Sequence, residues 1–201
     1  MAKLDLKREL KHLYASKRGV CVLVDVPPQQ FLMLDGQGDP NGSDAFQDAC
    51  GALYGMSYTL KFAMKATGQD YGVMPLEGLW WADDMASFSL DRRGEWRWRL
   101  MILQPDFVTA EDVAAAREQL RKKKDPPLLD DVRFERLEEG LSAHVLHVGP
   151  YADEGPTIEA LHQFIADQGR KPRGKHHEVY LGDPRRTAPE KLKTVIRQPV
   201  Q

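Results

Sequence analysis

An internal repeat is the feature of this sequence that most restricts its fold. Three apolar residues with helical spacing in the first half have counterparts in the second half at a constant offset of 112 residues: Phe46, Ala49 and Leu53 correspond to Ile158, Leu161 and Ile165. Further along, the segment 75–81 matches the segment 176–182 at an offset of 101 residues. Repetition of this kind predicts two similar supersecondary units, with an insertion between helix and strand in the first half.

The residue pattern within the halves predicts an α+β fold. Aromatic residues and arginines alternate from Trp96 to Leu100, which is typical of a half-buried antiparallel strand. Together with the repeat, this favours a single domain over residues 1–201 made of two tandem strand–helix–strand–strand modules, 19–104 and 105–201. Each module is expected to contain an antiparallel sheet with helices packed on one side.

Local signals add further expected elements. Thr109, followed three residues later by Asp112, has the spacing of a capping box and predicts the start of a helix. Apolar residues at helical spacing after Phe46 predict another helix, whose pattern resumes toward Lys65. Further predicted strands include the segments 20–26, 71–81, 85–90 and 176–181.

Composition excludes several classes of protein. The 201 residues are 42% hydrophobic and 29% charged, which is ordinary for a globular chain with a sizeable core. Cys21 and Cys50 are too few for a secreted disulfide framework, and the longest aliphatic run, Val20–Val24, is far below the roughly 20 residues that a bilayer requires. The net charge is −2, and the basic segments 121–124 and 170–175 have no interleaved aromatics. We therefore expect a soluble, cytoplasmic protein that binds neither nucleic acid nor membranes.

Glu178 is the first candidate for a functional residue. In a strand from His176 to Leu181, a period of two places His176, Glu178 and Tyr180 on one face. A carboxylate in an interior strand must be paired, hydrated or available to a ligand, and burial raises its pKa, which suits a general base. The alternative is a glutamate at the edge of a strand that pairs with a nearby Lys or Arg.

Glu77 is the second candidate, because two tryptophans follow it. In an extended strand, Trp80 and Trp81 point to opposite faces, and Trp81 shares the face of Glu77. An aromatic wall beside an acid suits planar or cationic ligands. The alternative is that both indoles belong to the core, as Trp96 and Trp98 are expected to.

Other chemical signatures are not supported by the residues. The Gly-rich segment Asp35–Pro40 lacks the lysine of a phosphate-binding loop and is expected to be a turn. Within their strands, His144 and His147 point to opposite faces, as do His176 and His177, and no cysteine or acid stands at ligand spacing to complete a metal site. We expect no metal and no cofactor.

Several longer segments, taken together, resemble a known family. These segments are Val26–Pro28, Phe31–Pro40, Tyr58–Phe62, Val73–Trp81, Glu178–Thr187 and Pro189–Pro199. They resemble the stand-alone GyrI-like small-molecule-binding family over nearly the whole chain. This family is related to the ligand-binding domains of multidrug-sensing regulators and to hydrolases of cyclopropane-bearing compounds.

The resemblance implies a fold and a ligand site. The implied fold has two modules related by pseudo-twofold symmetry, with a pocket between them that is lined by aromatics and an acid. Glu178 matches the position of that acid, and the resemblance implies that Tyr58, Tyr180 and either Trp80 or Trp81 form the walls. About 18 residues precede the first predicted strand, too few for a helix-turn-helix unit.

Two principal functions remain open on this basis. The first is a hydrolase of reactive planar xenobiotics, in which Glu178, helped or replaced by Glu77, activates water, and Tyr180 or Tyr151 donates a hydrogen bond to the ligand. The second is a non-catalytic binder or sensor of planar or cationic amphipathic compounds. A third is a protein-partner role such as modulation of gyrase. His176 is included among the ligand-binding residues, and the oligomeric state is left open.

Overall fold

The computed structural model describes residues 3–83 and 90–201, which divide into two compact units. Unit 1 comprises residues 1–9, 29–74 and 80–137, and unit 2 comprises residues 10–28, 75–79 and 138–201. Neighbouring strands within these units run antiparallel, and helices pack on them. The predicted α+β class is therefore confirmed.

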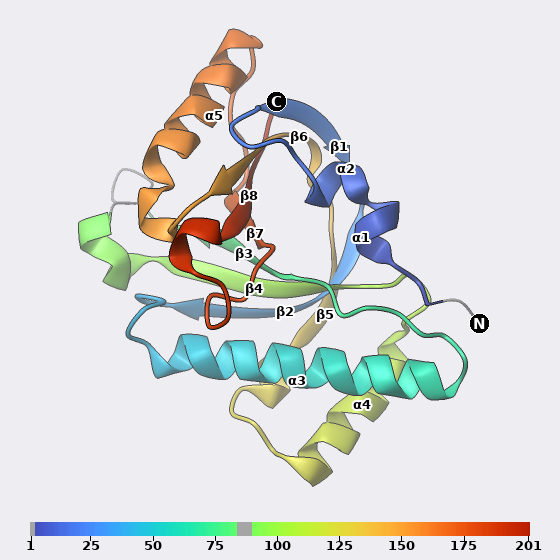
Figure 1. The fold of residues 1–201 in the computed structure, drawn as a ribbon. Helices are drawn as coiled ribbons and strands as arrows, with labels where there is room; N and C mark the ends of the chain where they lie inside the picture. The colour runs from blue at the N-terminus through green and yellow to red at the C-terminus, as the bar shows by residue number, and fades with distance from the viewer. Residues whose placement is uncertain (1–2, 84–89) are drawn as a thin grey trace. The chain divides into compact units, whose positions relative to one another are not determined.

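Unit 1 is a small sheet with a long helix against it. Strand β2 (Gln29–Gln37) lies between β4 (Arg97–Gln104) and β5 (Arg133–Leu137). The 23-residue helix α3 (Asp44–Ala66) packs on β2 and β4, and α4 (Ala110–Lys123) packs on α3 (Figure 1). The helical pattern predicted after Phe46 thus continues through Lys65 as a single helix.

Close packing in unit 1 centres on Trp98, which is fully buried. Its partner across the β2–β4 ladder is Gly36, and a Cβ at this glycine would lie only 2.0 Å from the Trp98 ring. The other side of the indole meets Phe46 of α3 edge-on, with ring centroids 5.3 Å apart. A strand glycine is required here because the indole occupies the space that any other side chain would need.

In unit 2 the strands pair antiparallel in the order β1, β6, β8, β7. Helix α5 packs on these strands through apolar residues that include Leu161 and Ile165, which meet Ala143 of β6 and Ile196 of β8. The first residues of β3, which spans both units, follow β7 in the strand order. The bounds are β1 Val22–Val26, β3 Leu76–Trp81, β6 Gly140–Val148, α5 Gly155–Asp167, β7 His176–Tyr180 and β8 Lys193–Pro199.

Short helices complete the described chain. Helices α1 (Leu6–Glu9) and α2 (Lys11–Tyr14) precede the first strand. Four 3₁₀ turns lie in connections: η2 Leu90–Glu95, η3 Leu129–Asp131, η4 Tyr151–Asp153 and η5 Pro189–Lys191. Within residues 3–83 and 90–201, no helix combines the length and the apolar character needed to cross a bilayer.

The two units have corresponding strand orders. In unit 1, β5 is followed by β2 and β4, and in unit 2, β1 is followed by β6 and β8. The first strand of the predicted module 19–104 therefore belongs to unit 2, and the first strand of module 105–201 belongs to unit 1. The modules and their pseudo-twofold relation stay predictions.

Two predicted strands differ in extent from the structure. The strand expected over 71–81 begins only at Leu76, directly after Pro75, whose nitrogen cannot donate to a ladder. The strand expected over 85–90 lies almost entirely outside the described residues.

Candidate functional site

The side chains of strand β7 alternate between the two faces of the strand, and each face carries polar residues. His176, Glu178 and Tyr180 lie on one face, and His177 and Val179 lie on the other. Glu178 is paired with Ile196 of β8, whose side chain belongs to the core beneath α5. The Glu178 face is therefore the one that α5 covers.

Glu178 is held by donors on both of its oxygens. His176 Nε2 lies 3.0 Å from Oε1, and the Tyr180 hydroxyl donates to Oε2 over 2.7 Å. The Tyr151 ring packs edge-on against Tyr180 with centroids 5.6 Å apart, and Tyr151 itself is 37% exposed. The structure thus brings together four predicted residues in unit 2: His176, Glu178, Tyr180 and Tyr151.

The charge state of Glu178 differs from the expectation. Burial acts to raise the pKa of Glu178, but the hydrogen bonds from His176 and Tyr180 and the charge of His176 outweigh it, so the pKa lies below its usual range. The expected increase is therefore wrong in direction. Glu178 is ionised at neutral pH and accepts hydrogen bonds.

A second acid, Glu154, lies beside Glu178 and was not predicted. It is only 4% exposed and stands between η4 and the first residue of α5. Burial and the negative charge of Glu178 raise the pKa of Glu154 to about 9, so this carboxyl is protonated at neutral pH. An acid at the start of a helix is ordinarily explained by the helix dipole, and so the sequence carried no distinguishing signal for it.

The loop that positions Tyr151 and Glu154 is fixed by His147 of β6. Its Nδ1 lies 2.9 Å from the Thr157 hydroxyl and its Nε2 lies 3.2 Å from the Pro150 carbonyl. Because a carbonyl can only accept, Nε2 carries a proton and donates to Pro150. Both ends of the loop are thus attached to one imidazole.

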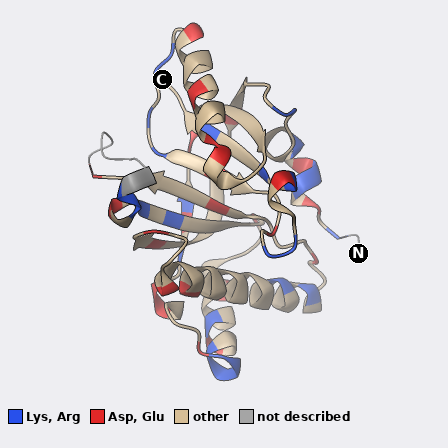
Figure 2. Cartoon of the chain, turned by 60° about the vertical axis from the view of Figure 1, so that its left-hand side comes forward, with Lys and Arg blue, Asp and Glu red and all other residues tan. Residues whose placement is uncertain are grey.

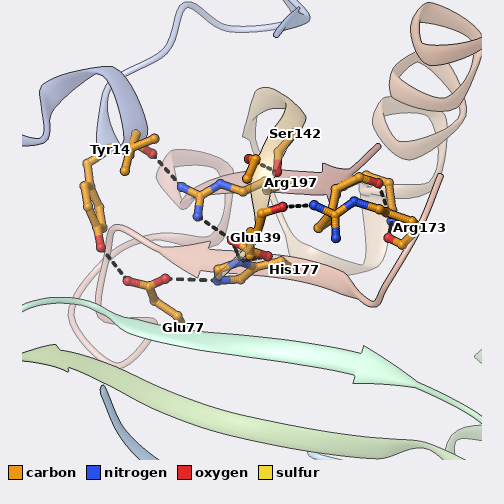
Figure 3. A network of polar contacts seen from close by, with 11 residues as sticks. Tyr14, Glu77, Glu139, Ser142, Arg173, His177 and Arg197 are labelled. Carbon is orange, nitrogen blue, oxygen red and sulfur yellow. Dashed lines mark hydrogen bonds and ion pairs between the residues drawn. The ribbon is translucent and has the colours of Figure 1, made fainter. Parts of the chain in front are cut away.

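Glu77, the second predicted catalytic residue, lies in a buried network (Figure 3). Its Oε1 accepts from the Tyr14 hydroxyl over 2.6 Å, and its Oε2 accepts from His177 Nε2 over 2.9 Å. Glu77 and His177 are both fully buried. Both oxygens of Glu77 are therefore occupied by side chains of unit 2, and the residue has a ready structural role.

The same network continues to the last strand. His177 Nδ1 lies 3.0 Å from Glu139 Oε1, and Arg197 Nη1 donates to Glu139 Oε2 over 3.1 Å. Arg197 Nη2 donates to the Leu13 carbonyl over 3.1 Å. Burial disfavours a charged imidazole, but the Glu139 carboxylate and the hydrogen bonds to Glu139 and Glu77 raise the pKa of His177 to about 9.

Within unit 2, Glu77 and Glu178 lie toward opposite faces of β7. Glu77 reaches His177, which is on the face of β7 opposite Glu178. In β3, Glu77 alternates with Trp80, which stacks on Phe46 of α3. The equivalence of the two acids at an offset of 101 residues stays a prediction.

The remaining predicted ligand residues belong to unit 1. Trp80 is 5% exposed and packs against Phe46 and Trp96, as expected of a core residue. Trp81 is half-buried at the end of β3. Tyr58 is 50% exposed on α3, where its ring stacks on that of Phe62.

Two other surface features of unit 1 contain none of the predicted site residues. A depression of about 360 Å³ lies between α3 and α4. The basic last turn of α4 (Figure 2) has Arg121 paired with Asp130 and Glu118, as expected of a solvated helix end. Among the described residues, no group of three or more His, Cys, Asp or Glu side chains could hold a metal ion.

Comparison with known proteins identifies the family. The model of the GyrI-like small molecule binding domain matches residues 21–201. The chain belongs to the GyrI-like family. This GyrI-like chain therefore carries a small-molecule-binding domain over nearly its whole length, as the sequence motifs indicated.

Solved structures support the same assignment. An uncharacterized conserved protein from Listeria innocua is 41% identical, with a TM-score of 0.93, over 99% of this chain and 100% of its own. A hydrolase from Listeria innocua is 40% identical, with a TM-score of 0.90, over 100% of both chains. The C-terminal domain of EcmrR, at 14% identity and a TM-score of 0.58 over 90% of this chain and 97% of its own, shares the fold alone. No curated protein sequence matches the GyrI-like chain.

Proposed function

We propose that the protein hydrolyses reactive planar small molecules, specifically cyclopropane-bearing compounds that alkylate DNA, at the Glu178 face of unit 2. The observation that carries this proposal is an ionised carboxylate held by His176 and Tyr180 next to the exposed ring of Tyr151. Two similar solved structures, 40% and 38% identical, are hydrolases from Listeria innocua, which supports the reaction class.

The proposed chemistry uses Glu178 as a general base. Its carboxylate takes a proton from water as the water oxygen attacks the strained ring. Tyr180 or Tyr151 donates a hydrogen bond to the carbonyl of the ligand, where negative charge develops. Trp81 and Tyr58 stay proposed as ligand walls, whereas the packing of Trp80 in the core of unit 1 favours a structural role.

A second candidate is a non-catalytic binder of cationic amphipathic drugs. It is favoured by the same carboxylate, because a negative charge beside two tyrosine rings attracts a planar cation. Both functions use a small-molecule ligand and require no cofactor. With only two cysteines in the chain, the cytoplasm is the proposed compartment.

Turnover of spiro[2.5]octa-4,7-dien-6-one, a cyclopropane conjugated to a dienone, tests the hydrolase. Water opens this ring to give 4-(2-hydroxyethyl)phenol, which is measured by chromatography against a protein-free control. More than one equivalent of product per protein is expected, and Glu178→Gln should lower kcat roughly 10²–10⁴-fold, as loss of a positioned base does.

If the protein is a non-catalytic binder, a different result is expected for Glu178→Gln. Glu178→Gln would then weaken benzyltrimethylammonium by about 1–3 kcal/mol, as loss of an interaction with a charged group does, and leave its neutral isostere neopentylbenzene unchanged. Absence of turnover with this pattern of affinities would replace the hydrolase by the binder.

A further inference from the structure

Glu154 is a buried acid without a counter-charge in the part of the chain that the structure describes. Its side chain is 4% exposed, and its Oε1 has no hydrogen-bond partner among these residues. None of the described Lys, Arg or His side chains forms an ion pair with it. An ionised carboxylate that is buried without a counter-charge is costly, which favours the neutral carboxylic acid.

Glu178, the neighbour of Glu154, has the opposite surroundings. Its two oxygens accept from His176 and Tyr180, so the charged form of Glu178 is stabilised while that of Glu154 is not. The electrostatic interaction of Glu154 with Glu178 places the two carboxyls beside each other. Two neighbouring carboxyls with such different surroundings hold one proton between them.

We propose that Glu154 and Glu178 form one acid–base pair, in which Glu154 donates a proton to the ligand while Glu178 accepts one from the attacking water. Glu154 thereby becomes a catalytic residue in addition to those expected from the sequence. Its role in turnover rests on the proposed hydrolase function, whereas the shared proton is a property of the resting protein and does not depend on it.

The reaction of the dienone balances with this pair alone. The oxygen of water forms a bond to a cyclopropane carbon and gives its proton to Glu178. The strained carbon–carbon bond breaks, its electron pair enters the ring, and the dienone oxygen becomes a phenol by taking the proton of Glu154. The proton on Glu178 then passes to the neighbouring carboxylate of Glu154, so the net reaction adds one water and restores the pair.

The shared proton can be measured without any ligand. Protein labelled with ¹³C at the side-chain carboxyl of glutamate is titrated by NMR, and the resonance missing from Glu154→Gln identifies Glu154. We expect its midpoint at about 9, and a decrease of about one unit or more in Glu178→Gln, because a neighbouring negative charge is removed. A Glu154 midpoint near the ordinary 4.3, or one that Glu178→Gln leaves unchanged, would overturn the pair.

Kinetics with the same dienone test the donor. Glu154→Gln should lower kcat roughly 10²–10⁴-fold with KM little changed, and should abolish the decline in kcat that the wild type shows above a pH of about 9, where Glu154 loses its proton. Glu159→Gln, which changes an exposed acid of the same helix, should behave as the wild type. Unchanged kcat in Glu154→Gln would overturn the donor role.

The two proposals fail in distinguishable ways. A wild type that shows the shared proton by NMR but no turnover would remove the hydrolase function and the donor role together, and leave the acid pair as a binding feature. A wild type that turns over while Glu154 titrates as an ordinary glutamate would keep the hydrolase and overturn the acid–base pair.

Discussion

His177 connects two carboxylates that are otherwise buried without solvent. Glu77 and Glu139 each contact one of its ring nitrogens, and Arg197 supplies a second cation to Glu139. With His177 protonated, two negative and two positive side chains balance inside unit 2. Removing one partner of such a buried group costs about 3–5 kcal/mol, because the remaining charges lose their compensation.

This arrangement predicts how stability depends on alkaline pH. The pKa of His177 is raised to about 9 in the folded protein, whereas a histidine in an unfolded chain titrates near 6.5. The protonated ring of His177 therefore contributes on the order of 3 kcal/mol to the free energy of unfolding. This contribution is fully present below a pH of about 6.5 and is lost as the pH rises through about 9. Urea unfolding at pH values from 6 to 10 should show this decline.

His177→Gln provides the comparison for that measurement. The variant should be less stable at neutral pH, and its free energy of unfolding should lack most of the slope between pH 6.5 and 9. A slope equal to that of the wild type would mean that another group causes the alkaline loss.

At the scale of elements, the start of α4 is a good test of local stabilisation. Thr109 accepts from the Asp112 backbone N–H over 3.2 Å, and the Asp112 carboxylate accepts from the Thr109 N–H over 2.9 Å. Thr109→Ala should therefore lower the free energy of unfolding by about 1 kcal/mol. Ser43 stands at the equivalent position before α3 but makes no side-chain capping bond. Ser43→Ala should cost clearly less in the same urea titration, and an equal loss would contradict the capping account.

Much of this element structure follows from local sequence. The capping box at Thr109 and the helix after Phe46 depend on spacings of three and four residues, and the structure confirms both. Strand pairing does not follow in the same way. The pairing of β1 with β6, and of β5 with β2, depends on contacts between residues far apart in the chain, which a local pattern does not contain.

For the candidate site too, local sequence predicted some relations between residues and missed others. Alternation along one strand correctly placed His176, Glu178 and Tyr180 on one face, because that relation is local. The proximity of Glu154 to Glu178, and of His177 to Glu139, arises only from tertiary packing. Their opposite charge states could not be predicted, because each depends on neighbours supplied by other elements.

At the scale of the whole molecule, the buried network joins the first and the last segments of unit 2. Tyr14 contacts Glu77, and the Leu13 carbonyl contacts Arg197, which is 184 residues further along the chain. Tyr14→Phe removes only the hydroxyl that donates to the buried carboxylate and should cost roughly 1.5–3 kcal/mol in urea unfolding.

Tyr58→Phe is the matched control, since it removes a tyrosine hydroxyl from a side chain that is 50% exposed. Its effect on stability should be within about 0.5 kcal/mol. If Tyr14→Phe were as harmless as the control, the Tyr14–Glu77 bond would not contribute to holding the segment in place.

The composition of the units has a consequence for synthesis on the ribosome, where the chain emerges from its N-terminus. Unit 1 contains nothing beyond Leu137, so all of its residues exist before the last third of the chain is translated. Unit 2 needs residues 10–28 and also β8, which is made last. At roughly 5–20 residues per second, β1 and the Tyr14 segment must wait several seconds for their partners while residues 138–201 are added.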